Sequence, residues 1–115
     1  MVVHIVLFRP KATLTGVEQR ALLASIEQAA AAIPSVRRFR IGRAVSDPPQ
    51  YELVGFPDLP YVAIVEFDDR AGLEAYLGDQ MHGELGRRFN DSLEAALIYD
   101  YEVTDAANLN AFVTK

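Results

Sequence analysis

The chain contains no cysteine, no run of lysine or arginine, and no apolar stretch of the roughly 20 residues that a membrane-spanning helix needs. Without cysteine there is no disulfide framework, no thiolate metal site and no cysteine nucleophile. The formal net charge is −5, and the arginines that cluster between residues 37 and 43 fit a solvated strand edge better than a nucleic-acid surface. We therefore expect neither nucleic acid nor a membrane among the partners.

The beginning of the chain has no charged lead-in and no small-residue cleavage site, so we expect no signal peptide and a cytoplasmic location. A length of 115 residues suits one domain, and a hydrophobic content of 50% is too high for a disordered chain. We expect a domain over residues 1–104 and a tail over residues 105–115. Apolar residues in that tail suggest that it docks on the body or on a partner subunit.

Periodic patterns predict strands and helices in the order strand, helix, strand, strand, helix pair, strand. Thr15 and Glu18 form a capping box that begins the first helix, and Pro34 ends it. Its expected buried stripe is Leu22, Leu23, Ile26, Ala29, Ala30 and Ile33. The predicted elements are strand Val2 to Arg9, helix Thr15 to Ile33, strand Val36 to Val45, strand Tyr61 to Phe67, two helices around Gly78-Asp79, and strand Ala96 to Thr104.

The segment Ser46 to Pro60 is the longest irregular stretch and contains four prolines and a glycine. It is either a connecting loop or a flap over a pocket or dimer contact, because several of its residues are too apolar for a loop wholly in water.

The order of elements indicates a ferredoxin-like α+β fold, with an antiparallel sheet covered by helices on one face. The strands Val2 to Arg9 and Tyr61 to Phe67 are apolar on both faces, so the second sheet face also needs cover. Two sheets packed face to face would remove that patch from water. We therefore predict a homodimer with a shared, sheet-lined interior, a dimeric α/β barrel.

Tyr76 and His82 lie in the predicted helix pair, and His82 is one of only two histidines in the chain. At about 100° per residue they would point roughly 240° apart on one straight helix. Gly78 can end the first helix in a left-handed cap, and Asp79 can cap the next helix. A break there would turn the phenol and the imidazole toward one apolar space.

Several short motifs, in this order and spacing, resemble the stress-responsive A/B barrel (Dabb) family over roughly residues 2 to 104. They are Val3-His-Ile-Val-Leu-Phe-Arg9, Ile33-Pro-Ser-Val36, Phe67, Leu73-Glu-Ala-Tyr-Leu77, His82 and Leu97-Ile-Tyr-Asp-Tyr101. The resemblance implies a dimeric α+β barrel. Most members have no settled activity, and a few are polyketide cyclases whose pocket lies between sheet and helices.

By position, the resemblance carries the cyclase histidine and tyrosine to His82 and Tyr76, and two supporting polar residues to His4 and Asp100. Val6, Phe8 and Phe89 are the expected apolar lining of that pocket. The chain departs from the family pattern before its last long helix, where it reads Asp79-Gln-Met-His82 without the usual proline and first histidine. This departure affects substrate identity more than fold.

Histidine takes and returns a proton near neutral pH, and tyrosine donates a hydrogen bond to a developing oxyanion. The pair would suffice for proton abstraction next to a carbonyl, with no cofactor. The alternative is that both are core residues of a non-catalytic, stress-related or small-molecule-binding barrel. A metal site of His4, His82 and Asp100, and a haem- or oxygen-using monooxygenase on the same scaffold, are weaker alternatives. Asp100, on an inward strand face, needs a partner, and His4 or His82 is the natural one.

Overall fold

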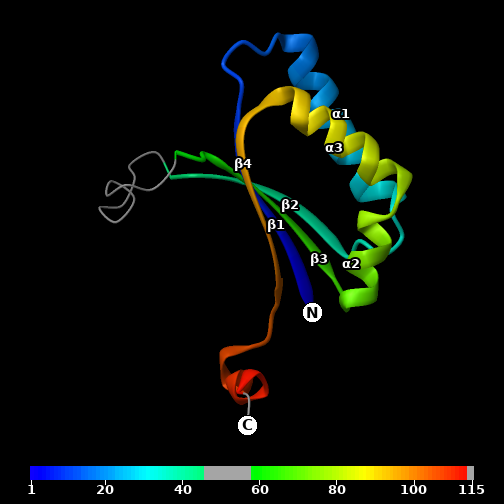
Figure 1. Ribbon diagram of the computed structural model, residues 1–115, viewed down its shortest axis with the longest axis vertical. Coiled ribbons are helices and arrows are strands. Elements are labelled where there is room, and N and C mark those ends of the chain that lie inside the picture. The colour runs from blue at the N-terminus through cyan, green and yellow to red at the C-terminus, as the bar shows by residue number, and fades with distance from the viewer. Residues whose placement is uncertain (46–57, 114–115) are drawn as a thin grey trace.

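The computed structural model describes residues 1–45 and 58–113, in which three α-helices cover one face of a four-stranded antiparallel sheet (Figure 1). The strand order is β2-β3-β1-β4, which confirms the expected ferredoxin-like α+β fold. The elements are β1 (Val2–Pro10), α1 (Gly16–Ala32), β2 (Arg38–Arg43), β3 (Tyr61–Phe67), α2 (Arg70–Leu77), α3 (Gln80–Ser92), β4 (Leu93–Glu102) and the 3-10 helix η2 (Ala106–Phe112). The segment Ser46 to Pro60 is the predicted loop or flap, and its residues 46–57 lie outside the described residues.

The strand β4 begins earlier than the sequence pattern predicts, because it continues directly from the end of α3. Leu93 pairs with Pro10 at the end of β1. The register shifts between Arg9 and Pro10, where the proline has no N–H to donate to the ladder. The backbone N–H of Lys11 then donates to the carbonyl of Ser92 at 2.8 Å. The sheet and the last long helix are therefore joined without a loop.

The two faces of the sheet follow from strict alternation along β1. His4 lies opposite Val65 on β3 and Asp100 on β4, and all three belong to the face that the helices cover. Ile5 lies opposite Ile64 and Tyr99 on the other face. We call this other surface the open face; its apolar members are Val3, Ile5, Leu7, Val62, Ile64, Leu97, Tyr99 and Tyr101.

Helix α1 begins at the predicted capping box. The Thr15 hydroxyl accepts from the Glu18 backbone N–H at 3.1 Å, and the Glu18 carboxylate accepts from the Thr15 N–H at 3.0 Å. Most of the predicted stripe is buried against the sheet, but Leu23 is 57% exposed. Leu23 is one position beyond Leu22 and therefore turns about 100° away from the stripe.

The predicted helix break at Gly78-Asp79 is present, with a different conformation at the glycine. Gly78 has φ −88° and ψ −5°, so it ends α2 in the right-handed region and the expected left-handed cap was wrong. Its N–H donates to the Glu74 carbonyl at 3.1 Å, and the Asp79 N–H donates to the Tyr76 carbonyl at 3.1 Å. The Asp79 carboxylate accepts from the Met81 N–H at 2.8 Å and so begins α3.

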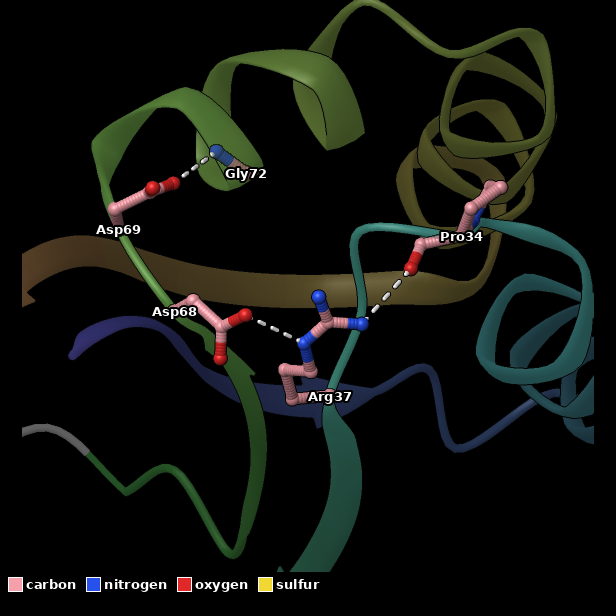
Figure 2. Close-up of polar contacts among 5 residues, drawn as sticks. All are labelled: Pro34, Arg37, Asp68, Asp69 and Gly72. Carbon is pink, nitrogen blue, oxygen red and sulfur yellow. Dashed lines mark hydrogen bonds and ion pairs between the residues drawn. The ribbon is translucent and has the colours of Figure 1, made fainter.

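The position of α2 is fixed at the end of β3 by two adjacent aspartates (Figure 2). Asp69 caps α2 by accepting from the Gly72 N–H at 2.9 Å. Asp68 accepts from the Arg37 guanidinium at 2.8 Å, and Arg37 also donates to the Pro34 carbonyl after α1 at 3.4 Å. This exposed ion pair adds little stability by itself. It nevertheless links the end of α1 to the start of α2, the helix that carries Tyr76.

The core fills the space between the helices and the covered sheet face. Tyr76, Phe67 and Val65 are its largest fully buried side chains. The tail leaves the sheet as η2, which extends beyond the ends of the strands in Figure 1. Its apolar side chains Leu109 and Phe112 are exposed in the single chain. Within the described residues, no helix is long and apolar enough to cross a membrane.

Candidate functional site

The break between α2 and α3 brings Tyr76 and His82 into contact. Their ring centroids lie 4.5 Å apart with an interplanar angle of 56°. Tyr76 is 2% exposed and also packs on Phe67 of β3, at a centroid distance of 5.2 Å. The two candidate catalytic residues therefore lie side by side, which one straight helix would not allow.

His4 joins this pair from the centre of the sheet. Its ring centroid lies 5.6 Å from that of Tyr76 and 6.2 Å from that of His82, in both cases edge to face. His4 Nδ1 lies 2.6 Å from Asp100 Oδ1 across the β1–β4 pair. An ionised carboxylate only accepts, so Nδ1 carries the proton and Nε2 of a neutral His4 holds a free lone pair.

Asp100 has the partner that the sequence predicted, but it lies at the edge of the site. Its side chain is 42% exposed, whereas that of His4 is 7% exposed. The reason is that β4 is an edge strand that the helices do not fully cover. The carboxylate therefore reaches the buried imidazole from a partly solvated position.

Burial changes the proton affinities of the two candidate catalytic groups in ways that suit their proposed roles. Burial, and then the nearby His4, lower the pKa of His82, while the backbone of Leu77 and the Asp79 carboxylate oppose that change. Burial raises the pKa of Tyr76 to about 12. Near pH 7 the imidazole of His82 is therefore mostly neutral and the phenol keeps its proton.

These rings line a cavity of about 210 Å³ between the sheet and α3. Val6 and Phe89, two of the three expected lining residues, are part of its wall. The third, Phe8, packs edge to face on Phe89 at 5.3 Å and faces a different cavity. The full lining is His4, Val6, Phe39, Ala63, Val65, Tyr76, His82, Leu85, Gly86, Phe89, Asn90, Leu93, Ala96 and Ile98.

That second cavity is larger, about 480 Å³, and lies between the first half of α1, the end of β1 and the start of β3. It is lined mainly by apolar residues such as Leu22, with Arg9 and Lys11 among the polar ones. Arg9 is already engaged by carboxylates, since Glu94 lies at 3.3 Å and Asp58 at 3.8 Å. Neither histidine lines it, so the smaller cavity is the one equipped for acid–base chemistry.

Sequence reasoning missed several lining residues, of which Gly86 is the most informative. It lies four positions after His82, and that spacing places both residues on one face of α3. Phe39, Ala63 and Ala96 also line the cavity, and strand alternation gives the signal for them. Among the described residues, no three His, Asp or Glu side chains are grouped closely enough to hold a metal ion.

Fold and site together define a small ferredoxin-like protein with a pocket, lined by histidine and tyrosine, between its helices and its sheet. The chain belongs to the stress responsive A/B barrel domain family, whose pattern matches residues 2–103.

Solved structures share this fold at low sequence identity. A Dabb family protein from Mesorhizobium loti is 24% identical with a TM-score of 0.71, over 90% of this chain and 97% of that one. A hydroxynitrile lyase from Passiflora edulis is 17% identical with a TM-score of 0.75, over 91% and 94%. A dimeric ferredoxin-like protein of unknown function from Thermobifida fusca is 19% identical with a TM-score of 0.69, over 89% and 90%. No curated protein matches the chain significantly in sequence.

Proposed function

We propose that this protein is a homodimeric, cofactor-free lyase or cyclase that transfers protons on a small hydrophobic carbonyl compound. The observation that carries the proposal is the convergence of Tyr76, His82 and His4 on one apolar cavity. Three groups able to hold or donate a proton are unusual around one largely apolar cavity unless protons are moved there.

In the proposed reaction, neutral His82 takes a proton from the carbon next to the carbonyl group. The electron pair of that C–H bond forms a carbon–carbon double bond while the π pair of the carbonyl group moves to its oxygen, and the Tyr76 hydroxyl donates a hydrogen bond to the resulting enolate oxygen. Because burial raises the pKa of Tyr76 to about 12, the phenol stabilises this charge while keeping its proton. The imidazolium of His82 then returns its proton to the product or to a leaving group.

His4 and Asp100 have a supporting role in this proposal. The carboxylate holds the His4 ring at 2.6 Å and fixes its tautomer, so that Nε2 acts as a hydrogen-bond acceptor for the substrate or for a proton in transit. The likeness in fold to a hydroxynitrile lyase supports a lyase among the candidate reactions. At 17% identity, that likeness gives no assignment of the substrate.

The homodimer is proposed to form through the open face. Ile5, Leu7 and Ile64 are only partly covered in the single chain, and Tyr99 and Tyr101 at the sheet edge are 44% and 52% exposed. Burying such side chains in full stabilises by ~1.5–3 kcal/mol each. The exposed Leu109 and Phe112 of η2 would then dock on the partner subunit.

Hydrogen–deuterium exchange at the methyl group of acetophenone in D₂O, followed by NMR, tests the proposed proton abstraction directly. It needs only the base and the oxyanion donor, not the natural substrate. Because general-base catalysis is typically worth ~10²–10⁴-fold, His82→Ala should remove most of the protein-dependent rate.

The matched control is Gln80→Ala, an exposed substitution in the first turn of the same helix, which should leave the rate unchanged. Wild-type protein that binds acetophenone without accelerating exchange would favour the non-catalytic binding protein instead. Equal rates for wild type and His82→Ala would exclude this histidine as the base.

A further inference from the structure

Helix α3 contains two glycines that nothing in the helix itself requires. Gly83 and Gly86 lie in its interior, where glycine is less stable than alanine. Neither has a positive φ, so the backbone does not require glycine at these two positions of the α-helix. Apart from the adjacent residues and the backbone of the helix itself, no atom of the described chain lies within 4 Å of the Cβ position at either residue, so close packing does not demand glycine. An explanation for these residues must come from outside the packing of the chain itself.

The two glycines differ in what they face. Gly83 is exposed and is not part of the cavity wall. Gly86 lines the cavity and lies on the same helix face as His82, one turn away. The missing side chain at residue 86 therefore leaves open space immediately beside the candidate base.

The opposite side of this space is also open. Ala96 and Ile98 of β4 are on the same sheet face as the buried Ala63 of β3, yet both are exposed, Ile98 to 60%. Both line the cavity together with Gly86. The cavity therefore opens to solvent between α3 and β4, with small or apolar side chains on the two sides.

The volume limits what can fill this space. An apolar cavity of about 150 Å³ is known to hold benzene. At about 210 Å³, the cavity has room for a single substituted ring.

We propose that Gly86 sets the size limit of the ligand cavity, and that the ligand is a single-ring carbonyl compound that enters between α3 and β4 past Ile98. This proposal rests on the proposed function for the identity of the carbonyl group. The missing side chain at residue 86 provides the space for the ring, and His4, Tyr76 and His82 surround its polar substituent.

Binding of two probes, acetophenone and the two-ring 2-acetonaphthone, measured by NMR titration of backbone amides, tests this proposal. Wild-type protein should bind acetophenone and not 2-acetonaphthone. Because one methyl group in a tight apolar pocket is worth ~10-fold or more, Gly86→Ala should weaken acetophenone binding by about that factor. Gly86→Leu should abolish it.

Gly83→Ala and Gly83→Leu are the matched controls. Both alanine variants should raise Tm, since alanine favours the helix at either position, but only the residue 86 variants should lose the probe. A loss of binding accompanied by a higher Tm cannot be attributed to unfolding. Unchanged binding in Gly86→Leu, or no binding of acetophenone by the wild type, would overturn the proposal.

These measurements distinguish a failure of the proposed size limit from a failure of the proposed catalytic function. Selective binding that depends on Gly86, without any exchange activity, would keep the size limit and exclude the catalytic role. Exchange activity that persists in Gly86→Leu would keep the catalytic role and exclude the size limit.

Discussion

Removing the hydroxyl of Tyr76 should separate its chemical role from the packing role of its ring. The ring is 2% exposed and contacts Phe67, His4 and His82 at centroid distances of 5.2, 5.6 and 4.5 Å. Tyr76→Ala would delete all of these contacts, and truncating a buried aromatic residue costs ~3–5 kcal/mol. Tyr76→Phe keeps the ring in place and removes only the oxygen.

None of the side-chain hydrogen bonds among the described residues involves the Tyr76 hydroxyl, so its removal breaks none of these bonds. A typical hydrogen bond is worth ~0.5–1.5 kcal/mol net, so without one Tyr76→Phe should change the free energy of unfolding by less than ~1 kcal/mol. The exchange rate with acetophenone should nevertheless fall roughly 10²–10³-fold, because the oxyanion loses its proposed donor.

Urea denaturation followed by circular dichroism gives the free energies of unfolding, and NMR gives the exchange rates on the same samples. Stability lost by ~2 kcal/mol or more in Tyr76→Phe would show that the hydroxyl has a structural partner. A wild-type exchange rate in that variant would exclude the oxyanion role. Tyr76→Ala provides the scale for the full packing contribution.

Three further predictions concern the dimer, the His4–Asp100 pair and His82. Ile5→Asp should give an insoluble or unfolded chain, because it forces an unpaired charge into the proposed open-face interface. Val17→Asp on the exposed side of α1 should not have this effect. A stable wild-type monomer in light scattering at micromolar concentration would contradict the proposed interface. Asp100→Asn should keep the fold but slow acetophenone exchange and shift the NMR signals of the His4 ring. Glu102→Gln, on the same strand, is the control. Unchanged His4 signals would mean that the His4–Asp100 hydrogen bond does not form in solution. Because the pKa of His82 is lowered in the folded protein, the unfolded chain binds more protons below pH ~6.5. The contribution of His82 to stability should therefore be full above that pH and decline as the pH falls toward the folded-state pKa. In urea denaturation at different pH values, His82→Gln should flatten this part of the dependence of stability on pH.

Much of the fold could be predicted because its signals are local. The strand Tyr61–Phe67 has the predicted bounds, and Thr15 and Asp79 cap the helices that their side chains indicated. These features depend on side chains acting on their own backbone within three residues. Such short-range interactions can be recognised in a single sequence.

The parts that were missed depend on how distant elements pack. Strand alternation placed Asp100 correctly on the face of His4, but its exposure depends on how far the helices extend over β4. Leu23 fits the apolar pattern of α1 and still lies outside the buried stripe. The conformation of Gly78 depends on hydrogen bonds at the junction of two helices, where right-handed and left-handed caps both accept glycine.

Two features that lower stability occur together around one cavity. The glycine at residue 86 weakens α3, and burial disfavours the charged form of His82. Selection for packing alone would favour alanine and an apolar residue at these two positions. Local costs of this kind are retained where they serve a site. Their coincidence at the Tyr76–His82 cavity, and not at the larger cavity beside α1, is the physical reason to look for ligand chemistry there.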